Sequence, residues 1–272
     1  MKRNKLNLLS SVLLLSMLFA LWSCGNSEEA DRVYELVWAD EFEGSAGQLP
    51  DTSKWVFDIG TDWGNSQLEY DTDRKENCSH DGKGNLAIYA RKENFAGSAF
   101  TSARIKTQGK FEQAYGRFEA RIKLPYGPGI WPAFWLLGAN IEEEPWPQCG
   151  EIDIMEFRGQ EPHLIHGTLH GPGYSGGASI TKSFSYPETR FDVDFHIYAV
   201  EWGEDYIQFF VDDNLYQELN PEDLTGEWVY DHPFFIILNL AVGGNYVGFP
   251  TKDTSFPQSM LIDYVRVYKE VE

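Results

Sequence analysis

Beyond residue 35 the chain is a succession of short segments in which apolar and polar residues alternate, and no stretch shows helical periodicity. In residues 117–124, charged residues occupy every second position and apolar residues occupy the others. Alternation of this kind places successive side chains on opposite faces of a β-strand. Many short strands separated by Gly, Pro, Asn and Asp predict an all-β sandwich of two packed antiparallel sheets. The predicted strands are residues 36–38, 85–91, 117–124, 130–137, 164–170, 195–202, 206–211, 234–240 and 261–268.

Two of these strands have informative faces. Residues 130–137 are apolar on both faces, so this strand is expected in the middle of its sheet. In residues 164–170, His166, Thr168 and His170 share one face. Neither a repeat nor a linker interrupts residues 35–270, which are therefore expected to form one domain.

The N-terminal segment has the organisation of an export signal. Basic residues near the start precede an apolar run from Leu8 to Trp22, which is short for a membrane span. Residues 21–24 (LWSC) resemble the lipobox of bacterial lipoproteins, although Trp22 departs from the usual small or aliphatic residue. We therefore expect residues 1–23 to be a lipoprotein signal peptide, Cys24 to carry lipid, and residues 24–34 to be an acidic tether. The protein is then exported and anchored to a bacterial membrane.

Charge restricts the partners of the mature chain. Residues 1–23 contain three basic and no acidic residues, so the remainder has 19 Lys and Arg against 42 Asp and Glu, a net charge of −23. Nucleic acids and anionic lipid surfaces require basic patches, whereas a neutral glycan tolerates this charge. Two cysteines remain after Cys24, namely Cys78 and Cys149, and the sequence leaves open whether they are free or paired.

The most concentrated set of ionisable residues is the stretch 150–157 (GEIDIMEF). Glu151 and Asp153 are two residues apart and share a face of a regular strand, whereas Glu156 would face the opposite way. A one-residue bulge near Met155 would return Glu156 to the face of the other two carboxylates, and bulges are common beside active sites. An edge strand with a solvated acidic face is the simpler interpretation.

Three carboxylates on one face suit glycoside hydrolysis. A retaining glycosidase uses one carboxylate to attack the anomeric carbon and a second carboxyl to protonate the leaving oxygen and then activate water. Asp153, between the two glutamates, is expected to hydrogen-bond Glu151 and to help keep Glu156 protonated. A metal site is the competing interpretation, but three acids in a row on a flat sheet enclose a cation poorly.

Aromatic and polar residues near this stretch favour a carbohydrate cleft, because sugars present apolar C–H faces to aromatic rings. Trp131 and Trp135 share a face of their strand, and Trp146 lies five residues before Glu151. Core packing is the alternative for each tryptophan. His170, followed by Gly-Pro-Gly, is also a candidate for the cleft, and Arg104 is expected either to bind sugar hydroxyls or to form a surface salt bridge.

With these flanking segments the chain resembles the laminarinases, endo-β-1,3-glucanases of glycoside hydrolase family sixteen. The resemblance covers about residues 35–269, and the E-x-D-x-x-E core indicates the bulged branch of the family. The matching stretches are residues 38–42 (WADEF), 51–55 (DTSKW), 101–107 (TSARIKT), 115–120 (YGRFEA), 129–138 (GIWPAFWLLG), 145–157 (PWPQCGEIDIMEF), 166–172 (HGTLHGP), 234–245 (FFIILNLAVGGN), 256–260 (FPQSM) and 263–268 (DYVRVY).

The resemblance implies a β-jelly roll whose concave sheet forms an open glycan cleft. It implies Glu151 as the nucleophile, Glu156 as the general acid/base and Asp153 as the assisting residue. No cofactor is implied for catalysis. The matching cleft positions are Asn65, Arg104, Trp131, Trp135, Trp146 and His170.

The resemblance also implies a structural calcium ion on the convex face. It would be held by backbone carbonyls of Glu41 and Gly84 and by the side chain and backbone of Asp263. Asp71 departs from the family pattern, in which a second tyrosine often follows Glu69-Tyr70, and this difference is expected to alter the outer glycone subsites.

The expected function is therefore retaining endo-β-1,3-glucanase activity on laminarin-like glucans, with mixed-linkage β-1,3-1,4-glucan as a further candidate substrate. Three alternatives stay open: the same chemistry on another polysaccharide such as a galactan, a transglycosylase, and a non-catalytic glycan-binding lipoprotein. A monomer is expected, because an open polymer cleft needs no second subunit.

Overall fold

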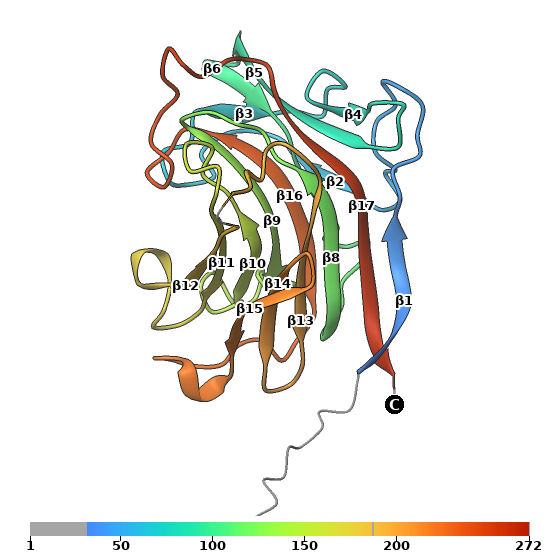
Figure 1. The fold of residues 1–272 in the computed structure, drawn as a ribbon, viewed down its shortest axis with the longest axis vertical. Coiled ribbons are helices and arrows are strands. Elements are labelled where there is room, and N and C mark those ends of the chain that lie inside the picture. The colour runs from blue at the N-terminus through green and yellow to red at the C-terminus, as the bar shows by residue number, and fades with distance from the viewer. Residues whose placement is uncertain (1–31, 187, 272) are drawn as a thin grey trace, which may run out of the picture. The chain divides into compact units, whose positions relative to one another are not determined.

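The computed structural model describes residues 32–186 and 188–271, so the predicted signal peptide and Cys24 lie outside the described residues. Almost all regular structure in the described part is β-strand (Figure 1). The strands are β1 (Val33–Asp40), β2 (Val56–Asp58), β3 (Glu69–Asp71), β4 (Cys78–His80), β5 (Leu86–Phe95), β6 (Ser98–Ser102), β7 (Arg104–Lys106), β8 (Gly116–Lys123), β9 (Ile130–Gly138), β10 (Glu151–Glu156), β11 (Ile165–His170), β12 (Ile180–Phe184), β13 (His196–Trp202), β14 (Ile207–Val211), β15 (Asn214–Leu219), β16 (Phe234–Val242) and β17 (Gln258–Val271). Two short 3₁₀ helices, η1 (Gly176–Ala178) and η2 (Pro221–Asp223), complete the elements.

The strands form two sheets. One sheet has seven strands in the order β12-β11-β10-β9-β16-β7-β2, and we call it the cleft sheet. The other has ten strands, with the path β15-β14-β13-β8-β17-β5-β6-β3 and with β1 and β4 joined to β17 and β5. Pairing is antiparallel except between β3 and β6, which run parallel. The predicted all-β sandwich of the jelly-roll type is confirmed.

Most of the strands predicted from alternation are present with shifts of a few residues at their ends. The segment predicted to be central, now β9, lies in the middle of the cleft sheet between β10 and β16. At the N-terminal boundary, β1 begins at Val33, so two residues assigned to the tether pair with β17. Short strands such as β2, β4 and β7 were not predicted, because three residues carry too little alternation to be recognised.

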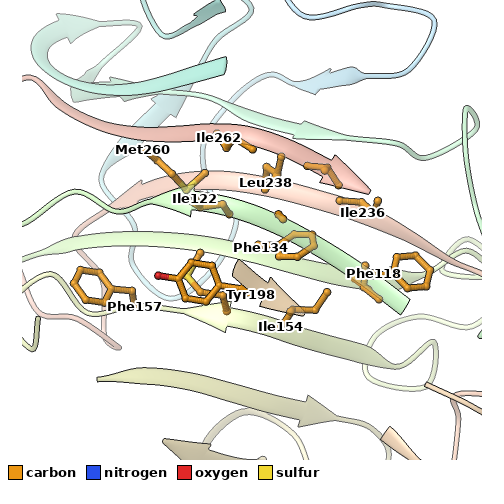
Figure 2. Close-up of a cluster of buried hydrophobic side chains, with 14 of the residues drawn as sticks. Phe118, Ile122, Phe134, Ile154, Phe157, Tyr198, Ile236, Leu238, Met260 and Ile262 are labelled. Atoms are coloured by element: carbon orange, nitrogen blue, oxygen red, sulfur yellow. The ribbon is translucent and has the colours of Figure 1, made fainter. Parts of the chain in front are cut away.

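The core lies between the sheets. Figure 2 shows Phe118 and Ile122 of β8 near Phe134 of β9, Ile154 of β10 and Leu238 of β16, all fully buried. Each strand contributes alternate side chains, so the opposite face of the cleft sheet is available for polar groups. The alternation that predicts the sandwich therefore also determines which residues face the cleft.

Both described cysteines, Cys78 and Cys149, are buried and free. Burial raises the pKa of both thiols, that of Cys149 to about 11, so neither is a reactive thiolate at neutral pH. No helix in the described part of the chain has the length and hydrophobicity needed to span a membrane.

Candidate active site

The acidic strand β10 contains the predicted bulge. Asp153 pairs with Trp135, but Met155 pairs with Phe134, so Ile154 is an extra residue relative to β9. The pairing with β11 shifts across the same interval. Ile154 and Met155 are consecutive, yet both are fully buried in the core. Because two neighbouring side chains point inward, Glu156 returns to the cleft face that Glu151 and Asp153 share.

The three carboxylates lie in one cleft of about 780 Å³. Trp146 Nε1 donates a hydrogen bond to Glu151 Oε2 at 2.8 Å, and Trp131 Nε1 donates one to Glu156 Oε1 at 3.1 Å. Thr168 Oγ1 lies 3.4 Å from Glu156 Oε2, a long and weak contact. Each glutamate is therefore oriented by an indole N–H from a different segment of the chain.

Burial and mutual repulsion raise the pKa of all three carboxyls. Burial, followed by the charge of Asp153, raises the pKa of Glu151 to about 8. Burial and the charge of Glu151 raise the pKa of Glu156 to about 7. The pKa of Asp153 lies well above its usual range because of burial and the charge of Glu156. The cluster therefore retains protons at neutral pH, as a site with a general acid requires.

The electrostatic support for Glu156 differs from the expected one. The sequence suggested that the charge of Asp153 would keep Glu156 protonated, whereas the neighbouring charge that raises the Glu156 pKa is that of Glu151. Asp153 acts on Glu151 instead, through its charge and a shared hydrogen bond. The nearly equal pKa values of the two glutamates do not by themselves assign the nucleophile.

His170 joins the site from β11, where it pairs with Glu151. Its Nδ1 accepts a hydrogen bond of 3.0 Å from the backbone N–H of Gly176, so the ring proton lies on Nε2. Nε2 is 3.1 Å from Asp153 Oδ2 and 3.7 Å from Glu151 Oε1. The imidazole thus presents an N–H toward two of the three carboxylates and connects them to the loop at η1.

A metal ion is the alternative occupant of this cluster. Ligand atoms of Glu151, Asp153 and His170 lie within 4.8 Å of one another. Protons compete for these atoms, however, because the pKa of both carboxyls is raised and a metal ligand must be deprotonated. The geometry of the three groups permits a cation, and binding one would release the protons that the two carboxyls hold.

The predicted tryptophans all line the cleft, with different exposures. Trp131 is only 8% exposed, packs at a tilted angle against Tyr246 with ring centroids 4.9 Å apart, and holds Glu156 through its Nε1–H. Trp146 is 45% exposed and covers Glu151. Trp135 is held by a 2.8 Å hydrogen bond from its Nε1 to Asn239 Oδ1. Trp131 therefore both lines the cleft and packs against other buried residues, as the core-packing alternative states.

Arg104 forms an ion pair and also lines the cleft. Its Nε lies 2.9 Å from Asp58 Oδ2. Its guanidinium lies 5.0 Å from the ring centroid of Trp63 and 4.9 Å from that of Trp135. The two alternatives from the sequence are thus compatible, since the ion pair fixes a cation between two aromatic rings. Asn65 also lines the cleft, where its backbone carbonyl accepts from Asn245 N–H at 2.7 Å.

Several cleft residues were not predicted. Asn239 interrupts the apolar run of β16, and an isolated polar residue in a central strand was a usable signal. Thr168 shares the face of His170 and was noted only for its alternation. Tertiary structure alone brings in the others, because they belong to loops or to an exposed edge strand. These residues are Trp63, Gln67, Ser179, Thr181, Asn245 and Tyr246.

Asp71, the departure from the family pattern, does not line the cleft. It is 2% exposed, and burial together with the charge of Glu69 raises its pKa well above the usual range. Its backbone pairs with Gly60, at the start of the loop that carries Trp63 and Asn65. Any influence of Asp71 on the glycone subsites is therefore exerted through this loop.

Comparison with known proteins identifies the family. The profile of Glycosyl hydrolases family 16 matches residues 61–266, which include all three carboxylates. The chain belongs to glycoside hydrolase family 16. It is 43% identical over 273 residues to the beta-glucanase of Rhodothermus marinus, covering 95% of this chain and 94% of that protein.

Solved structures of endo-1,3-beta-glucanases have the same fold. The catalytic domain of an endo-1,3-beta-glucanase (laminarinase) from Thermotoga petrophila superposes with a TM-score of 0.84 at 48% identity, over 89% of this chain and 100% of that one. The endo-beta-1,3-glucanase of Pyrococcus furiosus gives a TM-score of 0.83 at 47% identity, over 89% and 96%. Family 16 membership at this identity makes the chain a glycoside hydrolase.

The positions implied for a calcium ion converge on β17. Asp40, next to Glu41, pairs with Val265, and Leu86, two residues after Gly84, pairs with Ile262, so both segments approach the part of β17 that contains Asp263. Their oxygens are of the kind that calcium prefers. The Asp263 carboxylate contacts Arg121, and the Glu41 carboxylate accepts two hydrogen bonds from Arg266 at 2.8 and 2.9 Å. The donor types therefore suit a calcium ion, while Arg121 already pairs with the Asp263 carboxylate and would compete with the ion there.

Proposed function

We propose that this protein is a retaining endo-β-1,3-glucanase that cleaves laminarin-like glucans, with mixed-linkage β-1,3-1,4-glucan as a second substrate. The observation that carries the proposal is the bulge at Ile154, which places Glu151 and Glu156 on one face of a single strand within the cleft. The solved structures from Thermotoga petrophila and Rhodothermus marinus are those of laminarinases, and the Rhodothermus marinus relative is named a beta-glucanase. Two carboxyls and water suffice for this reaction without a cofactor.

In the first step Glu151 attacks the anomeric carbon of the glucosyl unit bound beside it. Glu156 donates its proton to the glycosidic oxygen, so the aglycone leaves as an alcohol and a covalent glycosyl-enzyme forms. The raised pKa of Glu156 keeps this proton available near neutral pH. Trp146 Nε1–H, 2.8 Å from Glu151 Oε2, orients this carboxylate for attack, and His170 lies beside it.

In the second step Glu156, now ionised, removes a proton from a water molecule that attacks the same anomeric carbon. The bond to Glu151 breaks, Glu156 regains its proton, and the product keeps the β-configuration. Trp131 Nε1 donates to Glu156 in both steps, so the carboxyl stays in one position while its charge changes. Each group ends the cycle in its starting protonation state.

The decisive experiment is incubation with a panel of laminarin, mixed-linkage glucan and galactan, followed by proton NMR of the early products. We expect β-anomers and internal cleavage of β-1,3-linked glucan. Preferential cleavage of the galactan would change the proposed substrate and leave the proposed mechanism unchanged. Products with new linkages would indicate a transglycosylase. Tight binding to laminarin without any product would indicate a glycan-binding protein.

We also propose that Glu41, Gly84 and Asp263 hold a structural calcium ion. Removal of calcium by a chelator is expected to lower the melting temperature by about 5–10 °C, because a ligand at 100 times its Kd adds about 2.7 kcal/mol of stability. Adding calcium back should restore the melting temperature, as measured by differential scanning fluorimetry. Asp263→Asn should reduce the response to chelator, whereas the exposed Glu143→Gln should retain it. Identical melting curves with and without chelator would contradict the calcium proposal.

Export and lipid attachment at Cys24 form a separate proposal, supported by the sequence of residues 1–24. In a bacterial host, the full chain is expected in the membrane fraction with a mass increased by lipid. Cys24→Ser should appear in the soluble fraction and keep its activity on laminarin. A wild-type protein found wholly in the soluble fraction with an unmodified Cys24 would contradict the proposal.

A further inference from the structure

The cleft is divided by β10 into two halves with different chemistry. Over β9, β16, β7 and the loop before β3, the wall is built from aromatic rings and a cation, represented by Trp63, Arg104 and Trp135. Over β11 and the edge strand β12, the described lining residues are mainly hydroxyl side chains and glycines, with the rings of His170 and Trp146 close to Glu151. A polymer that crosses the strands would therefore meet two different surfaces on either side of the scissile bond.

The hydroxyl half contains a continuous row of side chains that starts at Glu156. Thr168 Oγ1 lies 3.4 Å from Glu156 Oε2 and 3.1 Å from Thr181 Oγ1. Thr181 Oγ1 lies 3.2 Å from Ser179 Oγ. When the Thr168 hydroxyl donates to Glu156, the Thr168 oxygen accepts a hydrogen bond from the Thr181 hydroxyl. The Thr181 oxygen then accepts one from the Ser179 hydroxyl. We call Thr168, Thr181 and Ser179 the hydroxyl row.

The outer members of the hydroxyl row are accessible to a ligand. Thr181 is exposed on the edge strand and Ser179 is partly exposed. Gly176 and Gly177 lie beside them in the cleft lining and present backbone without side chains. The N–H of Gly176 is bonded to His170, so this backbone is fixed relative to the catalytic carboxylates. Neighbouring strands are about 4.8 Å apart, so the row spans about one to two sugar rings.

The two steps of the reaction place different demands on the two halves. The glycosyl part of the substrate must stay bound through both steps, which favours aromatic stacking and a charged hydrogen-bond donor. The aglycone must leave after the first step so that water can enter beside Glu156, which favours a few exchangeable hydrogen bonds. The hydroxyl row adjoins Glu156 and meets the second demand.

Taking the glucanase activity as proposed above, we propose that Thr181 and Ser179 form the subsite for the leaving sugar, and that the same hydroxyls bind an acceptor sugar in competition with water. The ligand class is a β-linked glucosyl residue on the reducing-end side of the cleaved bond. Its hydroxyls donate to and accept from the two side chains. These residues determine binding of the leaving sugar and do not take part in bond cleavage.

The test compares two substrates of equal glycone length, a laminari-oligosaccharide and an aryl glycoside whose leaving group is a nitrophenol. Thr181→Val removes a hydroxyl at constant shape, and Ser179→Ala removes the other. We expect kcat/KM for the oligosaccharide to fall about 3- to 10-fold for each variant, the effect of one lost hydrogen bond. Hydrolysis of the aryl glycoside should change less than about twofold, because a nitrophenol makes no hydrogen bonds to the row.

Transfer to an added acceptor provides a second measurement. With the aryl glycoside as donor and laminaribiose as acceptor, the ratio of transfer to hydrolysis should fall in both variants by a similar factor. Trp63→Ala is the matched control on the aromatic half, since it should lower kcat/KM for both substrates together. Equal losses on both substrates in Thr181→Val, or unchanged values throughout, would overturn the assignment.

Failure of this inference is distinguishable from failure of the proposed function. Wild-type protein that cleaves neither substrate would contradict the glucanase proposal itself. Wild-type protein that cleaves both, with variants that behave like wild type, would contradict only the leaving-sugar subsite. Melting temperatures of the variants should match wild type because Thr181 and Ser179 lie at the surface.

Discussion

Glu151→Ala is expected to lower kcat on laminarin by about 10⁴-fold or more, the scale of loss when a nucleophile is removed. Without this carboxylate, the oxocarbenium-like transition state has no attacking group on that face of the sugar. The variant should fold, because burial and the charge of Asp153 raise the pKa of Glu151 and the folded protein holds this carboxyl at a cost. Reducing-end release at saturating substrate measures the effect.

A small external nucleophile separates loss of the nucleophile from general damage. Azide fits in the space left by Glu151→Ala and attacks the same anomeric carbon of an aryl β-glycoside. The C–O bond to the aryl group breaks, the phenolate leaves, and the product is an α-glycosyl azide, detectable by NMR. Glu143→Ala, which removes an exposed carboxylate before β10, should keep wild-type activity and give no azide product. Substantial laminarin activity in Glu151→Ala would make the assigned mechanism wrong.

Glu156→Gln is expected to lower kcat/KM on laminarin by about 10²- to 10⁴-fold, the contribution of general acid–base catalysis. The amide keeps the hydrogen bond from Trp131 through its oxygen but transfers no proton. An aryl glycoside with an acidic phenol needs little protonation, so its first step should persist. The second step should become slow because no base activates water. A burst of phenolate followed by a slow steady state is the expected time course.

The pH profile tests the raised pKa of Glu156. Burial and mutual repulsion raise the pKa values of Glu151 and Glu156, so the pair shares a proton near neutral pH, and kcat/KM of the wild type on laminarin should fall as pH rises and this shared proton is lost. Glu156→Gln should lack this limb on the aryl glycoside. A wild-type profile that stays flat to pH 9 would show that the proton on Glu156 is not required, and would contradict its role as general acid.

The sequence alone was sufficient for the fold class and for the strand that bears the three clustered carboxylates. Strand alternation predicts the sandwich because a side-chain period of two exposes one face and buries the other. Parity also predicts the bulge, since Glu156 is an odd number of residues from Glu151 and must otherwise face the core. The structure confirms that bulge, with Ile154 and Met155 both buried.

Tertiary structure decided the rest of the site. The bulge offers no local signal that tells Ile154 from Met155 as the extra residue, because both are apolar and only the pairing with β9 distinguishes them. The hydroxyl row joins residues of β11 and β12 with the loop before β12, and Tyr246 reaches Trp131 from the loop after β16. Such contacts depend on strand order and register, which bring together residues that are far apart in the chain. The sequence thus determined which strand bears the carboxylates, and the register of its neighbours decided which other residues meet them.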